Sequence, residues 1–454
     1  MSARTGRFLG AALAALFLTA AAEPESRLEQ YQRLRREAVA AVKAGDLVKA
    51  EDMLGEAMSL YPDVPGSYIR LARVQAAAGA LESALSYVRI YADMGLLLDI
   101  ERDPALKALT TLPGYARVAA IFAANARPVG AVQAFATISG DPEFIGEGLI
   151  PHDKGWLLST VSGRTIVRLT PTGAMPFLKA DAETGAIFGM DADRRPGFHS
   201  GFLWAAEAWG EGVPGGVGPS RTGLLKVSLG DGRILARFPL PDDGGKHQFG
   251  DVLVAKDGTV YATDSVGGGV WRLKAGEVKL QRIVPAGRMA SPQGMVLCPG
   301  EKAMVVADYS TGLHRVDLVS GETRLLEGLT TGIESLPTGL AGTDALIRAP
   351  FMDVRGLVAG LPHRLGVIAT QNGVSPQRVV LLRISGGCDW IDDATVLAAN
   401  LPGMDDLSLA AVNGREVVFV GHARWDARGD DGKLTTPTPD PIRLFSLTLQ
   451  PTVQ

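Results

Sequence analysis

The sequence has few cysteines and no excess of positive charge. Only Cys298 and Cys388 are present among 454 residues, which is too few for the disulfide framework of a small secreted domain. An oxidising compartment could join them, but we favour the interpretation that both are buried, unreactive thiols. The formal net charge of −4 provides no basic surface for nucleic acid or anionic lipid, so we expect neither as a partner.

The motifs of several common enzyme classes are also absent. The sequence has no Gly-x-Ser-x-Gly elbow, no Walker loop and no His-Glu-x-x-His zinc motif. The histidines are scattered without the spacing of metal ligands, as His152, His199, His247, His314, His363 and His422. The acidic segment 426–432 lacks the alternate-position spacing of a calcium loop. No established catalytic or metal-binding motif therefore identifies a site.

The first residues have the features of a secretory signal peptide. Arg4 and Arg7 precede an apolar run from Phe8 to Ala20, and Ala20-Ala21-Ala22 offers small residues for cleavage. The run is short for a bilayer span, so an uncleaved membrane anchor is the less favoured alternative. We predict a signal peptide over residues 1–22, a periplasmic or secreted protein, and no membrane association beyond export.

Residues 23–128 are predicted to form a helical domain. From residue 26 to residue 92, apolar and small residues recur at intervals of three and four, the pattern of successive amphipathic helices. A shift of about 34 residues, the length of a tetratricopeptide repeat, superposes Ala38 on Ala72, Gly45 on Gly79, and Ala50 on Ala84. Segment 103–125 is expected to supply capping helices, and segment 127–130 ends the helical pattern.

This region resembles the tetratricopeptide repeat, in which small residues let paired helices approach closely and glycine permits the tight turn between them. The resemblance implies a groove that binds a peptide or protein partner. A helical cap packed on the next domain explains the same pattern, and both interpretations stay open.

Residues 129–454 change to short alternating apolar runs separated by Gly, Asp and Pro, which indicates strands. One strand pattern recurs at intervals of about 45 to 60 residues. Its copies are 156–159, 203–206, 260–263, 305–308, 367–370 and 418–421. We refer to these copies as the recurring strands.

Most recurring strands are followed by a second strand ending in a basic-apolar pair, such as Arg168-Leu169 or Arg315-Val316. Each unit is thus a meander of about four strands, which is typical of a propeller blade. The predicted fold is mainly β, a six-bladed β-propeller over 129–454 behind an N-terminal α-helical domain. Segment 132–138 is predicted to close the propeller by pairing with 443–447 in the last blade.

A polar residue followed by small and apolar residues precedes most recurring strands. The motifs are Glu147-Gly148-Leu149, Asp251-Val252-Leu253, Gln293-Gly294-Met295, Glu334-Ser335-Leu336 and Asp405-Asp406-Leu407, while Phe188-Gly189-Met190 breaks the pattern. Because the innermost strands line the central channel, these side chains should converge on one axis. Carboxylates so close cannot all stay ionised unless a cation binds or their pKa values rise. Oxygen ligands suit Ca²⁺ or a similar divalent cation.

Several segments resemble the gluconolactonase/regucalcin family of six-bladed propellers. They are Phe249-Gly250-Asp251, Tyr261-Ala262-Thr263-Asp264, Ser291-Pro292-Gln293-Gly294 and Val306-Ala307-Asp308-Tyr309. The resemblance implies a metal-dependent hydrolase of sugar lactones, with the metal held by Glu147, Gln293 and Glu334. It also implies that Glu334 or Asp251 takes a proton from the attacking water. The family's asparagines and aspartate are replaced here by Gly250, Gln293 and Glu334.

Further residues are predicted to face the same pocket: Asp405, Asp406, His247, Gln371 and Asn372. His247 is also explained as an ordinary loop histidine, and Gln371-Asn372 as part of a tight turn. Asp264 and Asp308 are interpreted as residues that brace turns or blades. Segment 341–361 is interpreted as an insertion that lengthens the fifth blade.

Two functions follow from these patterns. The first is an exported lactonase-like, metal-dependent hydrolase that acts on a sugar lactone or related ester in the propeller channel. The second is a non-catalytic scaffold, in which the helical repeats bind a protein and the propeller supplies a rigid surface. In that case the carboxylates would hold only a structural cation or water.

Overall fold

The computed structural model describes residues 25–170, 173–193, 195, 201–214, 216–326, 340–347, 365–429 and 432–449. The predicted signal peptide lies outside these residues. The helices of the described chain are α1 (Arg27–Ala44), α2 (Leu47–Leu60), α3 (Pro65–Ala77), α4 (Leu81–Asp93), the 3₁₀ helix η1 (Lys107–Thr111) and α5 (Tyr115–Asn125). None of these helices has the length and apolar character needed to span a bilayer.

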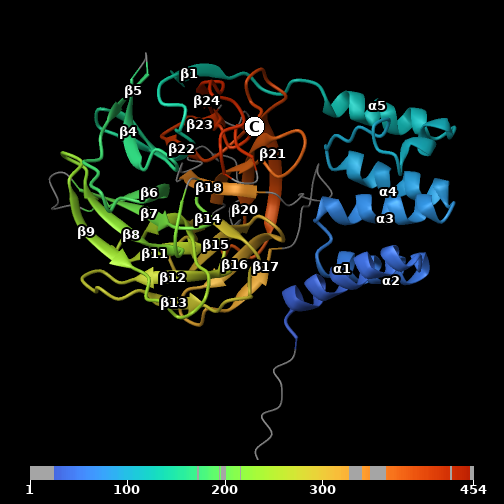
Figure 1. Cartoon of the computed structure of the whole chain (residues 1–454), viewed down its shortest axis with the longest axis horizontal. Coiled ribbons are helices and arrows are strands. Elements are labelled where there is room, and N and C mark those ends of the chain that lie inside the picture. Colours follow the sequence, from blue (N-terminus) through green and yellow to red (C-terminus); the bar gives the residue numbers. More distant parts are fainter. Residues whose placement is uncertain are drawn as a thin grey trace, which may run out of the picture.

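The helices form the predicted N-terminal domain, with α1 packed on α2 and α3 on α4 (Figure 1). The superposed alanines lie buried at these pair contacts, namely Ala38, Ala50, Ala72 and Ala84. Helix α1 begins with a capping box, in which Ser26 and Glu29 each bind the other's backbone amide. It ends at Gly45, whose φ of +77° favours glycine. The tetratricopeptide assignment itself stays a prediction.

The strands form four-stranded antiparallel sheets arranged as six blades, as predicted. Blade 1 contains β2 (Gly146–His152), β3 (Gly155–Thr160), β4 (Thr165–Thr170) and β5 (Gly173–Pro176). Blade 2 contains β6 (Ala186–Asp193), β7 (Phe202–Trp209), β8 (Arg221–Ser228) and β9 (Ile234–Pro239). Blade 3 contains β10 (Phe249–Val254), β11 (Val260–Asp264), β12 (Gly269–Leu273) and β13 (Gln281–Val284).

The remaining blades follow the same order along the chain. Blade 4 contains β14 (Pro292–Leu297), β15 (Ala303–Asp308), β16 (Gly312–Asp317) and β17 (Thr323–Leu325). Blade 5 contains β18 (Leu340–Ile347), β19 (Leu365–Gln371), β20 (Arg378–Ile384) and β21 (Ile391–Ala399). Blade 6 contains β22 (Ala410–Asn413), β23 (Glu416–His422), β24 (Ile442–Thr448) and the early strand β1 (Gln133–Ile138).

Each recurring strand is the second strand of its blade, which confirms the predicted register. These strands are β3, β7, β11, β15, β19 and β23. Strands β11 and β15 are buried along their whole length, because neighbouring blades cover both faces of the sheet. Within the described residues, one apolar cluster lies between each pair of neighbouring blades. The repeated apolar pattern in the sequence therefore corresponds to the side chains that pack between neighbouring blades.

The propeller closes as predicted. Strand β1 pairs antiparallel with β24, with Ala134 opposite Phe445 and Thr137 opposite Arg443. The last blade thus takes its outer strand from the segment directly after the helical domain. Gly130 lies at this junction with φ +79°, where an added Cβ would approach the Leu397 carbonyl oxygen to 1.9 Å, so only glycine fits there.

The expectation of two unreactive thiols is wrong. Cys298 and Cys388 form a disulfide, with Cα atoms 6.0 Å apart. Cys298 follows the first strand of blade 4, and Cys388 lies between the last two strands of blade 5. Both side chains are buried in the apolar cluster between these blades. The sequence separation of 90 residues concealed this proximity, since neighbouring blades bring distant segments together.

The interpretation of segment 341–361 as an insertion is also wrong in part. Its beginning belongs to β18, the first strand of blade 5, which pairs with β19. The sequence of this strand, Leu-Ala-Gly-Thr-Asp-Ala-Leu-Ile, has small residues at its centre and a weak apolar alternation. That composition obscures the strand pattern.

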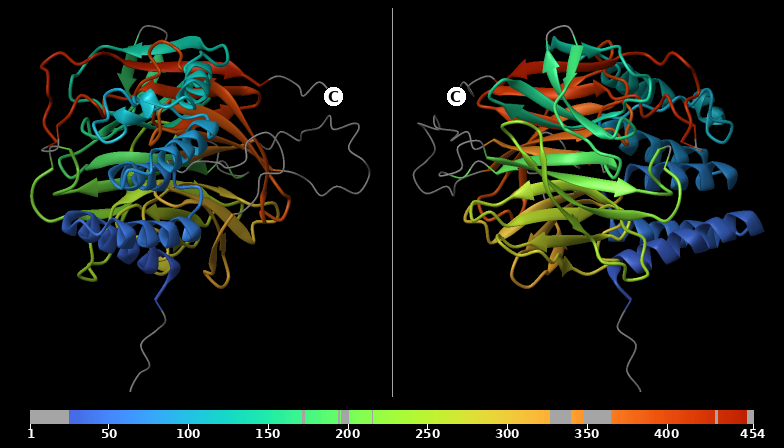
Figure 2. Two further views of the ribbon diagram at one scale, coloured as in Figure 1. Left: turned by 90° about the vertical axis from the view of Figure 1, so that its right-hand side faces the viewer. Right: turned by 60° about the vertical axis from the view of Figure 1, so that its left-hand side comes forward.

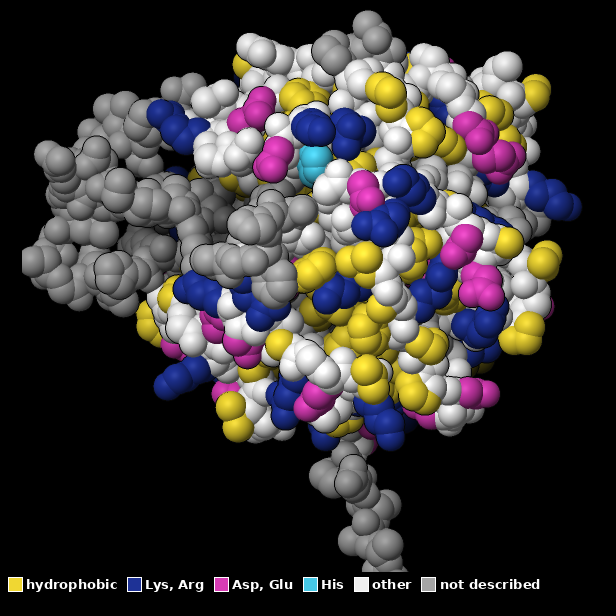
Figure 3. Space-filling view, turned by 90° about the vertical axis from the view of Figure 1, so that its left-hand side faces the viewer, with side chains coloured by type: hydrophobic (Ala, Val, Ile, Leu, Met, Phe, Trp, Pro, Cys, Tyr) yellow, Lys and Arg dark blue, Asp and Glu magenta, His cyan; other side chains and the backbone are white. Residues whose placement is uncertain are grey.

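The helical domain packs on one end of blades 4 and 5 (Figure 2). The Arg378 guanidinium donates to the carbonyl oxygens of Met94, at 3.3 Å, and Gly95, just beyond the C-terminus of α4. Arg378 is 3% exposed, and its charge faces the negative end of the helix dipole. Leu97 N also donates to Ser375 O at 2.6 Å. Figure 3 shows the opposite side of the molecule, where acidic and basic side chains are interspersed.

Candidate functional site

The first strands of the blades surround the propeller axis, and three of the predicted site residues lie on them. Strand β2 contacts β6 and β22, and β10 contacts β6 and β14. Glu147 lies on β2, Asp251 on β10 and Gln293 on β14. Asp406 precedes β22 and forms an isolated bridge with His422. Glu334 lies outside the described residues.

Glu147 lies partly buried at the centre of this arrangement. Its Oε2 accepts hydrogen bonds from Ser408 Oγ at 2.6 Å and from Trp425 Nε1 at 2.9 Å. Burial raises the pKa of Glu147, these two hydrogen bonds lower it, and the neighbouring charge of Asp406 raises it again. Asp406 therefore lies close enough to Glu147 to oppose its ionisation.

Asp251 is buried more deeply and is not satisfied by the protein. It is 2% exposed, and neither carboxylate oxygen has a hydrogen-bond partner in the described part of the chain. Its pKa is raised to about 8, mainly by burial and also by the charges of Asp191 and Glu147, although the nearby backbone amides of Val252 and Met295 lower it. An ionised carboxylate that is buried without partners is costly, so the protonated form of Asp251 is favoured.

Gly189 explains why blade 2 departs from the polar motif. An added Cβ at Gly189 would lie 2.1 Å from Asp251 Oδ1. Any larger residue would displace the carboxylate from the channel. The break in the pattern at Phe188-Gly189-Met190 thus makes room for Asp251.

A group of potential metal ligands lies beside Glu147. Asp406, His422 and Asp426 each offer a ligand atom, and these atoms lie within 4.8 Å of one another. Asp406 Oδ2 accepts from Trp425 N at 2.6 Å, and the indole of Trp425 binds Glu147. Burial raises the pKa of Asp406, and the charge of Asp426 raises it further. Asp251, Glu147, Asp406 and Asp426 form a continuous acidic group, which we call the axial cluster.

The ring of His422 is oriented in the manner of a metal ligand. Its Nδ1 lies 2.8 Å from Asp405 Oδ1, and no other described group bonds the ring. A carboxylate on Nδ1 fixes the ring and leaves Nε2 for a cation, an arrangement common in metal sites. Asp405, predicted to face the pocket, thus supports the histidine. Neither His422 nor Asp426 was predicted as a site residue, because neither has motif-like spacing.

The loop between β19 and β20 holds the segment that carries Asp406. Asn372 Nδ2 donates to Leu407 O at 2.8 Å, and Gln377 Oε1 accepts from Leu407 N at 2.6 Å. Gln371, predicted with Asn372 to face the pocket, accepts instead from Arg378 Nε at 2.6 Å. The same loop therefore contacts both the helical domain and the axial cluster, so the helices dock at the end of the propeller where this cluster lies.

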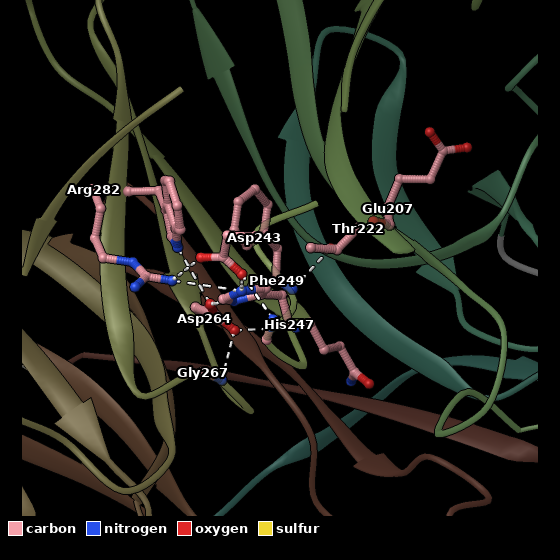
Figure 4. Close-up of polar contacts among 11 residues, drawn as sticks. Glu207, Thr222, Asp243, His247, Phe249, Asp264, Gly267 and Arg282 are labelled. Atoms are coloured by element: carbon pink, nitrogen blue, oxygen red, sulfur yellow. Dashed lines mark hydrogen bonds and ion pairs between the residues drawn. The ribbon is translucent and has the colours of Figure 1, made fainter. Parts of the chain in front are cut away.

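Gln293 and His247 are held by other partners. The Gln293 amide donates to Ser291 Oγ at 3.0 Å and accepts from Ser265 Oγ at 3.4 Å. His247 lies between Asp264, at 2.5 Å from Nδ1, and Asp243, at 2.8 Å from Nε2 (Figure 4). Both ring nitrogens of His247 are thus bound by residues outside the axial cluster.

Asp264 and Asp308 bind turns, as predicted. Asp308 accepts from the backbone amides of Ala290, Ser291, Ser310 and Thr311, and from the Thr311 hydroxyl. Asp264 likewise accepts from two backbone amides, those of Gln248 and Gly267. Each joins the segment entering its blade to the turn after the second strand.

No family model matches the sequence, and no curated protein is detectably similar to it. Solved propellers are similar only at low scores. A luciferin-regenerating enzyme shares 12% identity at a TM-score of 0.44, covering 71% of this chain and 96% of that one. The PQQ-bound aldose sugar dehydrogenase of Streptomyces coelicolor shares 14% at 0.42, covering 71% and 99%. An inactive virginiamycin B lyase of Staphylococcus aureus with quinupristin shares 12% at 0.39, covering 70% and 99%. The six-bladed architecture therefore rests on the strand pairing, and no activity is inferred from these proteins.

Proposed function

We propose that the protein is an exported, metal-dependent hydrolase of a lactone or related ester, with its site at the axial cluster. The observation that carries the proposal is Asp251, whose buried carboxylate has no hydrogen-bond partner among the described residues and lies near Glu147, which in turn lies near Asp406. A divalent cation would neutralise carboxylates that otherwise oppose one another.

The described residues offer a chemically reasonable ligand set. Asp406, His422 and Asp426 would hold the cation, which when bound would polarise a carbonyl and a water molecule. Glu147 would orient the substrate or water from the opposite side. The predicted roles of Gln293 and Glu334 as ligands, and of Glu334 or Asp251 as base, remain part of the proposal. At neutral pH the raised pKa favours protonated Asp251, so it could serve as a base only with the cation bound.

The identity of the cation also belongs to the proposal. Ca²⁺ was predicted from the carboxylates, and it prefers oxygen ligands. The imidazole of His422 adds a nitrogen donor, which is more typical of Zn²⁺ or Mn²⁺ sites. Metal analysis of the purified protein distinguishes these cations directly.

Two observations support export. The N-terminal sequence has the features of a signal peptide, and the protein contains a disulfide. Disulfides persist in the periplasm and outside the cell, and are rare in the reducing cytosol. Fractionation of the native host should therefore recover the protein outside the cytoplasm, and recovery from the cytoplasm in reduced form would contradict export.

The hydrolase is tested by assaying a lactone panel with the wild type and with the variants Glu147→Gln and Asp406→Asn. We expect activity that is abolished by a chelator, and that falls by at least about 100-fold in Asp406→Asn. The matched control is Asp93→Asn, which changes an exposed carboxylate of α4 paired with Arg89. Hydrolysis that survives metal removal and both axial variants would reject the proposed site.

The scaffold remains the second candidate because the helical domain has an apolar groove of about 440 Å³. Val39 and Val42 of α1 line it and are 50% and 46% exposed. Lys43, Arg70 and Arg73 lie at its edge. Failure to bind any divalent ion or hydrolyse any lactone would favour this function over the first.

A further inference from the structure

A second cleft, of about 730 Å³, lies on blade 2 and the segment leading into blade 3. Its polar and aromatic lining includes Glu207, Trp209, Arg221, Arg237, Asp242 and His247. None of the axial cluster residues lines it. The cleft is therefore distinct from the proposed hydrolytic site.

Glu207 comes directly after the recurring strand of blade 2, as Asp264 does in blade 3, and Asp308 ends the recurring strand of blade 4. Both aspartates bind several backbone amides. Glu207 is equally buried, at 1% exposed, but accepts only one hydrogen bond, from Gly185 N to Oε1 at 2.8 Å. Its second oxygen, Oε2, has no hydrogen bond to any described residue.

The nearest group to this oxygen is also unsatisfied. Arg237 Nε lies 3.9 Å from Glu207 Oε2, which is too far for a hydrogen bond. That Nε is buried without a partner among the described residues, whereas Nη2 of Arg237 donates to Asp181 at 2.6 Å. A donor and an acceptor thus face each other across a gap. A hydroxyl group between them could accept from Nε and donate to Oε2.

Arg221 provides a positive charge beside this pair. Its guanidinium lies 5.3 Å from the ring centre of Trp209, and its charge lowers the pKa of Glu207, which burial raises to about 7. Arg221 is exposed, and its guanidinium forms no hydrogen bond with the described residues, although its backbone pairs with Trp209 in the sheet. Trp209 is fixed in turn, because its Nε1 donates to Glu183 O at 2.8 Å. Arg221 is therefore positioned to bind an anionic group.

At the other end of the cleft, the ring of His247 is satisfied by the protein, although Nε of the nearby Arg282 has no hydrogen-bond partner among the described residues. His247 is bound on both ring nitrogens by Asp243 and Asp264, and Arg282 donates to Asp243. Figure 4 shows that the Glu207 side chain extends away from this group. The His247 end of the cleft therefore has a structural role, and the residues available to bind a ligand lie at the Glu207 end.

We propose that this cleft binds a small polyhydroxylated carboxylate, such as a sugar acid. One ligand hydroxyl bridges Glu207 Oε2 and Arg237 Nε, and the ligand carboxylate pairs with Arg221. A hydroxy acid combines the two features that the cleft requires, an O–H that both donates and accepts and a negative charge. The proposal does not depend on a cation at the axis.

The test is isothermal titration calorimetry of the full chain with D-gluconate, and with D-glucose as the probe that lacks the carboxylate. We expect gluconate to bind the wild type at least about tenfold more tightly than glucose, consistent with a charge-assisted contact. Arg221→Gln should weaken gluconate about tenfold and leave glucose unchanged. Glu207→Gln should weaken both probes.

Two further measurements separate this site from the axis and from solvent. Asp406→Asn disables the proposed cation site and should leave gluconate binding unchanged; loss of binding there would place gluconate at the axis and overturn the proposal. Because Arg221 is exposed, Arg221→Gln should fold. This variant therefore tests the proposal even if Glu207→Gln unfolds. Absence of binding to the wild type, equal binding to Arg221→Gln, or a crystal structure with gluconate present but only water between Glu207 and Arg237 would each contradict it.

Discussion

Asp308 and Asp251 are both buried aspartates of the same propeller, in neighbouring blades, yet their surroundings differ completely. Asp308 accepts hydrogen bonds from a set of backbone amides and a threonine hydroxyl. Asp251 accepts none from the described residues. A carboxylate surrounded by donors joins parts of the fold, whereas one without donors requires a proton or a cation.

The comparison extends to other buried charges. Arg378 resembles Asp308, because neutral carbonyl and amide oxygens surround its guanidinium and join two domains. Glu207 resembles Asp251, because one of its oxygens accepts no hydrogen bond from the residues that the structure describes and lies beside a cleft. Satisfaction of hydrogen bonds, more than burial alone, therefore separates structural charges from candidate functional ones.

The largest effect is expected from Asp308→Ala. This change leaves several buried donors without an acceptor, so the free energy of unfolding should fall by about 3 to 5 kcal/mol. Urea denaturation followed by tryptophan fluorescence measures it. A loss below about 1 kcal/mol would mean that hydrogen bonding to Asp308 does not hold blade 4 together.

A smaller effect is expected from Arg378→Gln. The shorter neutral side chain cannot reach the carbonyl oxygens at the end of α4, which should cost about 2 to 3 kcal/mol. Hydrogen exchange should show the loss first in segment 94–98, which contacts the loop between β19 and β20. Unchanged protection of that segment would show that Arg378 does not fasten the helical domain.

Asp251→Asn should change the pH dependence of stability. Because burial raises the pKa of Asp251 from 3.8 to about 8, the folded protein binds this proton more tightly than the unfolded chain. Its contribution to stability is therefore full below about pH 4 and is lost as the pH rises through 8. In metal-free buffer the wild type should lose up to about 1.4 kcal/mol per pH unit relative to the variant in this range. Parallel pH profiles would contradict the assignment.

The smallest effect is expected from Asp93→Asn, the exposed control. Its ion pair with Arg89 spans 3.6 Å with both side chains about half exposed. Such pairs contribute less than about 0.5 kcal/mol, so unfolding and metal content should match the wild type. A large change would mean that the control does not isolate the buried charges.

Much of the fold could be predicted, because the buried strand of each blade repeats the same apolar pattern in the sequence. The second strand of every blade is covered on both faces, so its apolar pattern recurs through Val260, Val305 and Val418 alike. Strand β18 was not predicted, because its small residues do not form this apolar pattern. The disulfide was not predicted, because Cys298 and Cys388 meet only where blades 4 and 5 pack together. Their spacing in the sequence does not indicate this contact.

The site could be predicted only in part. Glu147 and Asp251 were identified from their place on the first strands, which the channel geometry requires. His422 and Asp426 were missed, although His422 directly follows a recurring strand, as Asp264 does. The position directly after a recurring strand could therefore have identified His422 from the sequence. Asp426 comes from a long loop whose path no sequence period describes.

The most direct test of the account is proton release on cation binding, measured by calorimetry at pH 7 in buffers of different ionisation enthalpy. Because the pKa of Asp251 is raised to about 8, this carboxyl holds a proton at pH 7 that a bound cation should displace. We predict release of about one proton per bound divalent ion in the wild type, and no measurable binding in Asp406→Asn. Binding without proton release, or equal binding by the variant, would contradict a cation site at the axial cluster.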